Sequence, residues 1–178
     1  YRLFQKHNYL NELYADENIL NSLKMLSGTN SIFRLFQTLR FDLSPEYHHA
    51  LSWHQDFFDA VRPFNKDCFA VWTPITKLLN KTGGLEIMVG SHKQKLIQNE
   101  IKCRNSNNSA YLNLKFPKDF IKKHNQLKIR CNEGESLIMS MSLVHRTFKG
   151  SDEGLRVTAL SRFIPDNSKN MNFIYSNF

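Results

Sequence analysis

Seven short runs of alternating apolar, β-branched and aromatic residues follow one another along most of the chain, each bounded by turn-forming residues. Segments such as Ser-Pro, Arg-Pro, Thr-Gly-Gly and Asn-Glu-Gly-Glu favour chain reversal over continued strand. The predicted strands cover residues 31–41, 47–57, 67–76, 84–89, 127–131, 136–148 and 155–164. Many short strands with little helix between them predict a mainly β fold, an antiparallel sandwich or barrel.

Two segments do not follow the strand pattern. Between residues 8 and 26 apolar side chains recur roughly at helical spacing until Ser27-Gly28, so one or two short helices are expected there. Residues 93–124 are polar and rich in Asn and Lys, which is typical of a surface excursion, with a short helix expected at 117–124. Because 178 residues with 41% hydrophobic content can bury one sizeable core, a single domain over residues 1–178 is predicted.

The charge balance of 24 basic and 16 acidic residues gives a formal net charge of +8, which suits a nucleic acid or an anionic small molecule. The basic residues are dispersed, and their densest group is without the aromatic series that single-strand binders use. That group consists of Lys115, Lys118, Lys122, Lys123 and Lys128. We therefore expect a small-molecule substrate and no nucleic acid as partner, with a basic nucleic-acid-binding module as an alternative.

The cysteines Cys68, Cys103 and Cys131 are widely spaced and form no Cys-x-x-Cys pair. Neither a disulfide framework nor a zinc site is indicated, and a cytoplasmic location is expected. No apolar run approaches the roughly 18 residues that a membrane span needs, so no membrane partner is expected. The chain begins at Tyr1 rather than Met, which leaves a removed leader open, and the sequence indicates no oligomeric state.

One short motif has the composition of a metal site. In the stretch LSWHQDFFDAV, residues 51–61, His54 and Asp56 are two positions apart, so on a strand they point to the same side while Gln55 faces away. An imidazole and a carboxylate can then bind one ion. The motif alone is weak evidence, because with 7 histidines about one sequence in three of this kind contains it by chance.

His145 is the histidine best placed to complete such a site. It ends an alternating apolar face in the run ESLIMSMSLVH, so its imidazole is expected to project inward, although a lone histidine there is often a satisfied core residue. That face comprises Leu137, Met139, Met141, Leu143 and His145. Two histidines and one carboxylate are the ligand set of non-heme Fe(II) oxygenases, whereas zinc more often closes with a fourth ligand.

Arg156 follows His145 by eleven positions (156 − 145) and stands in the apolar strand GLRVTALSRF. An arginine inside a strand requires a partner, and its guanidinium matches a carboxylate bidentately. A small diacid bound beside the metal would be that partner. A solvent-facing position, or pairing with a structural Asp or Glu, is the alternative.

These features together resemble those of the phytanoyl-CoA dioxygenase family, whose members are Fe(II)- and 2-oxoglutarate-dependent oxygenases. The resemblance, over about residues 31–165, rests on His54-x-Asp56, Trp72, the segment GGLEIMVGSHK, His145 and Arg156. It implies a double-stranded β-helix, a cupin-like jelly-roll barrel, over residues 31–165. Residues 1–28 would be a helical flank and residues 166–178 a C-terminal tail.

The resemblance also implies roles for single residues. His54, Asp56 and His145 would hold Fe(II), and Arg156 would bind the distal carboxylate of 2-oxoglutarate, with Thr147 as a second contact.

Three further side chains are less clear. Trp72 matches the family but is equally explained by core packing. Gln37 and Arg40, on the strand before the His-x-Asp motif, differ in parity, so one of them faces the cavity; we favour Gln37 as the cosubstrate contact. His92, in the Gly-Ser-His-Lys turn, is expected to be structural rather than a ligand.

The implied reaction uses O2 and 2-oxoglutarate to hydroxylate a C–H bond of an unidentified small molecule, releasing succinate and CO2. A cupin-like metal-binding barrel without oxygenase activity is the alternative, and Arg156 discriminates the two. Family members carry a longer region before the His-x-Asp motif, whereas His54 here is preceded by 53 residues (54 − 1). The chain is therefore expected to be N-terminally truncated or a minimal version, and a fatty acyl substrate is not inferred.

Overall fold

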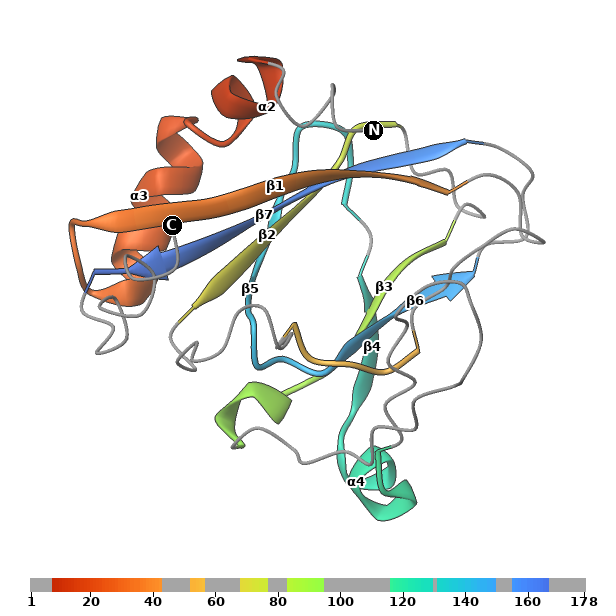
Figure 1. Cartoon of the computed structure of the whole chain (residues 1–178). Helices are drawn as coiled ribbons and strands as arrows, with labels where there is room; N and C mark the ends of the chain where they lie inside the picture. Colours follow the sequence, from red (N-terminus) through yellow and green to blue (C-terminus); the bar gives the residue numbers. More distant parts are fainter. Residues whose placement is uncertain are drawn as a thin grey trace, which may run out of the picture.

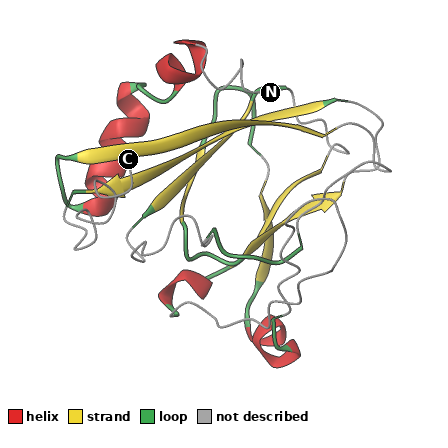
Figure 2. Cartoon of the chain, in the orientation of Figure 1, coloured by secondary structure: helices red, strands yellow, loops and turns green. Residues whose placement is uncertain are grey.

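The computed structural model describes residues 8–42, 52–56, 68–76, 83–94, 116–129, 131–149 and 155–166. Within these ranges two antiparallel β-sheets form the body of the protein, with short helices outside them (Figure 1, Figure 2). The helices are α2 (Asn8–Leu13), α3 (Glu17–Ser27), the 3-10 helix η3 (Ser91–Lys93) and α4 (Lys118–Lys123). The strands are β1 (Ile32–Asp42), β2 (Phe69–Pro74), β3 (Gly83–Met88), β4 (Gln126–Ile129), β5 (Leu137–Ser140), β6 (His145–Lys149) and β7 (Arg156–Pro165).

The chain passes back and forth between the two sheets. The large sheet has the strand order β1-β7-β2-β5, and the small sheet has the order β4-β3-β6. Strands β1 and β2 belong to the large sheet, β3 and β4 to the small one, and β5, β6 and β7 then alternate between the sheets. This arrangement is a double-stranded β-helix of the jelly-roll type, so the predicted mainly β fold is confirmed.

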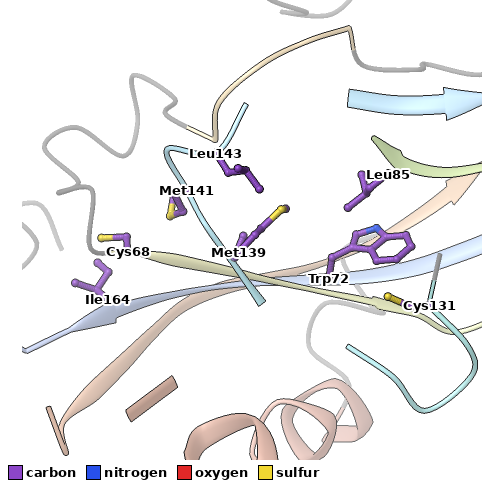
Figure 3. Close-up of a cluster of buried hydrophobic side chains, with 9 residues drawn as sticks. Cys68, Trp72, Leu85, Cys131, Met139, Met141, Leu143 and Ile164 are labelled. Atoms are coloured by element: carbon purple, nitrogen blue, oxygen red, sulfur yellow. The ribbon is translucent and has the colours of Figure 1, made fainter. Parts of the chain in front are cut away.

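A hydrophobic cluster contributed by both sheets lies between them and defines their inner faces. Figure 3 shows Trp72 of β2 beside Leu85 of β3, with Met139 of β5 close to them. Ala70 and Trp72 point into this cluster, whereas Val71 packs on the opposite, outer face of the large sheet. The alternation of inward and outward side chains predicted from the sequence is therefore present in β2.

The outer face of the large sheet is covered by α2 and α3 (Figure 1). Asp16 caps the start of helix α3, because its carboxylate accepts hydrogen bonds from the amides of Asn18 and Ile19. Gly28, in the left-handed conformation with φ 68°, caps its end. Its buried residues, Ile19 and Leu23, pack on the sheet. The predicted N-terminal helices are therefore two, and they close one side of the barrel.

A third cluster, on the outer side of the small sheet, joins Met88 and Phe116 to Trp53 and Val144. The predicted helix at 117–124 is confirmed as α4. Gly84 in β3 leaves no room for a side chain, because an added Cβ would lie 2.8 Å from the carbonyl oxygen of Ile129 and 2.9 Å from the ring of Phe148. This close packing explains the second glycine of the Gly-Gly pair, whereas the first, Gly83, has a positive φ of 81°.

Two predicted strands differ from the structure. The run 136–148 is not one strand: β5 ends at Ser140 in the large sheet, and β6 begins at His145 in the small sheet. The turn between them keeps Met141 and Leu143 on the inner side, which is why the apolar alternation is continuous in the sequence. Of the predicted strand 47–57, residues 47–51 and 57 lie outside the described ranges, and residues 52–56 form an isolated bridge at His54.

Candidate metal centre

The segment 52–56 sends its side chains alternately to opposite sides. Trp53 packs in the outer cluster, where the guanidinium of Arg146 lies 4.4 Å from its ring centre. Gln55 donates a 2.6 Å hydrogen bond from Nε2 to the carbonyl of Ser142. His54 and Asp56 point the other way and lie with His145. Trp53 and Gln55 therefore anchor the segment, while His54 and Asp56, which alternate with them, point into the interior.

Backbone hydrogen bonds fix this segment against the start of β6. The amide of His54 donates to the carbonyl of His145, and the amide of His145 donates to the carbonyl of His54, both at 2.9 Å. The amide of Asp56 donates to the carbonyl of Met141 at 3.0 Å. These main-chain hydrogen bonds bring the two predicted ligand segments together, and the side chain of Gln55 adds a further bond between them.

The three predicted ligands form one compact group. Their potential ligand atoms all lie within 4.8 Å of one another, and Oδ1 of Asp56 is 3.9 Å from Nε2 of both His54 and His145. A separation of 3.9 Å is too long for a hydrogen bond, but it leaves space for an ion between the atoms. Within the described residues, no other group of His, Cys, Asp and Glu has this geometry.

The far ring nitrogens of both histidines are held by backbone carbonyls. Nδ1 of His54 is 2.7 Å from the carbonyl oxygen of Ser52, and Nδ1 of His145 is 2.9 Å from that of Leu143. When Nδ1 carries the proton and donates to these carbonyls, the lone pair of Nε2 is free for a metal. Both imidazoles are therefore oriented for coordination through Nε2.

The electrostatics favour the protonation states that bind metal. Burial, with His145 close by, lowers the pKa of His54 to about 4, although Asp56 opposes the shift. Burial alone would raise the pKa of Asp56, but Arg162, His145 and His54 outweigh it and hold this pKa below its usual value. At neutral pH the site offers a neutral imidazole at His54 and an ionised carboxylate, the forms that metals require.

These residues fit a bound metal ion by their donor set and by their burial. Asp56 is 2% exposed and His145 4% exposed, so these donor groups are held away from bulk water, where they interact strongly with a bound cation. Two nitrogen donors and one oxygen donor on the same side suit a borderline divalent ion with further positions open, as in the non-heme iron triad. The protein contributes the ligands and fixes their orientation.

Arg162 is a site residue that the sequence analysis missed. Its Nη2 lies 3.2 Å from Oδ2 of Asp56, and its side chain is buried on the inner face of β7. The available signal was its parity: Arg156, Leu160 and Arg162 share one face of their strand, and Leu160 packs against the inner cluster. The sequence alone does not show which carboxylate forms an ion pair with Arg162.

Arg156, Thr147 and Arg40 lie on the inner faces of three different strands. Arg156 is 6% exposed at the beginning of β7, where alternation places it on the same face as Leu160. Thr147 is paired across the sheet with Leu85, a member of the inner cluster. Arg40 donates a hydrogen bond from Nη1 to Oγ1 of Thr147 at 3.4 Å. Its positive charge also contributes, after burial and His145, to the lowered pKa of His54.

The expectation that Gln37, rather than Arg40, faces the cavity is wrong. Nε2 of Gln37 donates to Oδ1 of Asn11 in α2 at 3.0 Å, on the outer side of the large sheet. Arg40 is paired with Thr158, an inner-face residue of β7, whereas Gln37 is paired with Ser161, of opposite parity. Because side chains alternate along a strand, only one of these two residues can face inward. Gln37 faces outward, where it contacts Asn11 of α2, so Arg40 faces inward.

Trp72 is placed inside the barrel, packed with Leu85 and Leu137 in the inner cluster (Figure 3). This contact is core packing; a contact between Trp72 and a cosubstrate stays a prediction. His92 is exposed and lies outside the metal-site group, and its carbonyl accepts a hydrogen bond from Oγ of Ser142. Its neighbour Ser91 is fully buried and accepts a hydrogen bond from the amide of Val144 at 2.9 Å. The Gly-Ser-His-Lys motif thus supports the turn that leads into His145.

The fold and the buried triad define the class: a double-stranded β-helix protein with a candidate centre of two histidines and one carboxylate. The chain belongs to the phytanoyl-CoA dioxygenase (PhyH) family, whose model matches residues 3–157. No curated protein matches the chain.

Solved structures show the same fold at low sequence identity. EctD from S. alaskensis with 2-oxoglutarate and 5-hydroxyectoine has a TM-score of 0.69 and 14% identity, over 90% of this chain and 54% of that one. The epimerase SnoN in complex with Fe3+, alpha ketoglutarate and nogalamycin RO has a TM-score of 0.68 and 12% identity, over 89% of this chain and 59% of that one. The chain thus spans a little more than half the length of these proteins.

None of the helices in the described ranges is long and apolar enough to cross a membrane.

Proposed function

We propose that this protein is an Fe(II)- and 2-oxoglutarate-dependent dioxygenase that hydroxylates a C–H bond of a small molecule. The observation that carries the proposal is the buried group of His54, Asp56 and His145, with both Nε2 atoms 3.9 Å from Oδ1 of Asp56. This donor set leaves open the positions that a bidentate cosubstrate and O2 require. Membership of the PhyH family and the complexes of EctD and SnoN support it.

Each residue has a defined task in this proposal. His54, Asp56 and His145 bind the metal, and the planar guanidinium of Arg156 pairs with the distal carboxylate of 2-oxoglutarate, whose geometry it matches. Thr147, held by Arg40, offers a second polar contact at that end. Iron and 2-oxoglutarate, when bound, supply the activation of O2, with oxidative decarboxylation to succinate and CO2.

The low exposure of the site has a chemical consequence. Asp56, His145 and Arg156 are each 6% exposed or less, so the reacting centre is shielded from bulk water, which strengthens the interactions with charged ligands. The protein orients the cosubstrate and limits unproductive oxidation. The balanced reaction takes one R–H, one 2-oxoglutarate and one O2 to one R–OH, one succinate and one CO2.

The experiment is a screen for succinate formation with Fe(II), 2-oxoglutarate, O2 and pooled small metabolites. We expect slow succinate formation alone, stimulation by the pool that contains the substrate, and a product heavier by one oxygen atom. His145→Ala should abolish all turnover. His124→Ala, which removes a histidine at the end of α4, is the matched control and should retain it.

The products of the reaction distinguish the proposed hydroxylase from two alternative functions. A stereoisomer formed with succinate but without a gain of oxygen would indicate an epimerase, the activity named for SnoN. The other outcome is a protein that binds the metal but neither binds 2-oxoglutarate nor forms succinate with any pool. That result would indicate a metal-binding barrel without oxygenase activity.

A further inference from the structure

The two carboxylate oxygens of Asp56 have different surroundings. Oδ1 lies 3.9 Å from Nε2 of both His54 and His145. Oδ2 lies 3.2 Å from Nη2 of Arg162. One oxygen is thus directed at the metal position, while a guanidinium engages the other.

Arg162 is not needed to bring Asp56 to the site. The amide of Asp56 is already fixed to the carbonyl of Met141, and its segment is anchored through Gln55 to Ser142. What the main chain leaves free is rotation of the carboxylate about its own side-chain bonds. The guanidinium of Arg162, itself 5% exposed and carried by β7, is the ion-pair partner of one of the two carboxylate oxygens, Oδ2.

Carboxylates bind divalent ions through one oxygen or through both. A second bond from Oδ2 would take a position that the open-faced triad otherwise leaves for cosubstrate or O2. The ion pair with Arg162 competes with such a bond, because Oδ2 would have to move away from the guanidinium in order to reach the metal.

We propose that Arg162 is a positioning residue that keeps Asp56 bound to the metal through Oδ1 alone, so that a bidentate cosubstrate can chelate the ion. The inference rests on the proposed function and adds a determinant of coordination mode to it. Without Arg162, Oδ2 turns toward the metal, and the site also loses a positive charge next to the ion.

The two binding steps should therefore respond differently to Arg162→Met. Metal affinity should stay within about threefold of the parent or rise, because a cation is removed and an oxygen donor is gained. Affinity of the metal-loaded protein for 2-oxoglutarate should fall by about tenfold or more, because a coordination position is occupied. Arg162→Lys, which keeps a charged donor for Oδ2, should recover part of the 2-oxoglutarate affinity.

The experiment uses the whole chain and two probes. Mn(II) binding is followed by the electron paramagnetic resonance signal of the free ion, and 2-oxoglutarate binding by the visible charge-transfer band of the anaerobic Fe(II) protein. Infrared difference spectra with and without Mn(II) report the carboxylate, since the separation of its two stretching bands is larger when one oxygen binds. The matched control is Arg34→Met, which removes an arginine whose guanidinium pairs with Asn11 on the outer side of the large sheet.

The expected result is a smaller band separation and weakened 2-oxoglutarate binding in Arg162→Met with metal binding retained, and parent behaviour in Arg34→Met. Unchanged 2-oxoglutarate affinity would overturn the inference. Parallel loss of metal and 2-oxoglutarate in both Arg162 variants, or the same change in Arg34→Met, would also overturn it, because Arg162 would then act through overall structure or charge. Absence of the band in the parent protein would instead count against the proposed function.

Discussion

The amides of His54 and His145 each donate a hydrogen bond to the other residue's carbonyl oxygen at 2.9 Å, and their imidazole centres lie 4.2 Å apart. This reciprocal pair joins a short segment of the chain to the first residue of β6. It places two side chains that are distant in sequence on the same side of the small sheet. The metal centre is therefore built into the main-chain pairing of the barrel.

We predict that His54→Ala lowers the affinity for a divalent metal by at least about tenfold while the fold persists. The reason is that the side chain is lost but the reciprocal backbone hydrogen bonds remain available to alanine. Anaerobic titration with Fe(II), together with far-ultraviolet circular dichroism, measures both properties. Full-affinity binding of one ion per chain by this variant would mean that His54 is not a ligand.

Substitutions of Arg156 should change cosubstrate binding and leave metal binding nearly intact. Arg156→Lys keeps the charge but loses the planar fork, so 2-oxoglutarate binding should weaken by about 1–3 kcal/mol, and Arg156→Ala should weaken it further. Titration of the metal-loaded protein with 2-oxoglutarate measures the effect. An Arg156→Ala protein that binds 2-oxoglutarate like the parent would contradict the assigned role.

Stability of the metal-free protein should fall as pH falls from about 6.5 to about 4. The folded-state pKa of His54 is lowered to about 4 by burial and by His145, so in this window the unfolded chain binds more protons than the folded one. The contribution is fully present above the unfolded pKa and is lost as pH approaches the folded pKa, by up to about 3 kcal/mol.

Urea unfolding of the metal-free protein at a series of pH values measures this dependence. His54→Gln cannot take up the proton and should show a shallower decline between pH 6.5 and pH 4. An equally steep decline in this variant would assign the effect to other groups.

Much of the site could be predicted because strand alternation alone sets which side chains share a face. It correctly directed His54, Asp56 and His145 toward one another and put Arg156 on the inner face of its strand. It failed where the choice depended on packing partners: Gln37 and Arg40 differ in parity, but the sequence does not show that α2 lies outside the sheet and contacts Gln37.

Other features depended on contacts between residues far apart in the chain. The ion pair between Arg162 and Asp56 joins β7 of the large sheet to the separate segment 52–56, and no local pattern specifies it. The change of sheet between Ser140 and His145 was hidden because the turn preserves the apolar alternation. Burial of Ser91 against the turn likewise follows from tertiary packing.

Ser91 offers a test of how the turn before His145 is held. Ser91→Ala should lower the free energy of unfolding by about 1–3 kcal/mol, because the amide of Val144 loses its buried hydrogen-bond acceptor. Metal affinity should fall as well, since this turn leads directly into His145. Denaturant unfolding and metal titration measure the two effects, with Lys93→Ala, at an exposed position of η3, as the control. Unchanged stability in Ser91→Ala would show that the turn does not depend on this hydrogen bond.

In the proposed function, the group of His54, Asp56 and His145 binds Fe(II) together with 2-oxoglutarate. The most direct measurement is an anaerobic titration of the Fe(II)-loaded parent protein with 2-oxoglutarate, followed in the visible range. We expect a charge-transfer band that saturates at one 2-oxoglutarate per iron and is absent in Asp56→Ala. Stoichiometric iron binding without any such band at saturating 2-oxoglutarate, or the same band in Asp56→Ala, would contradict it.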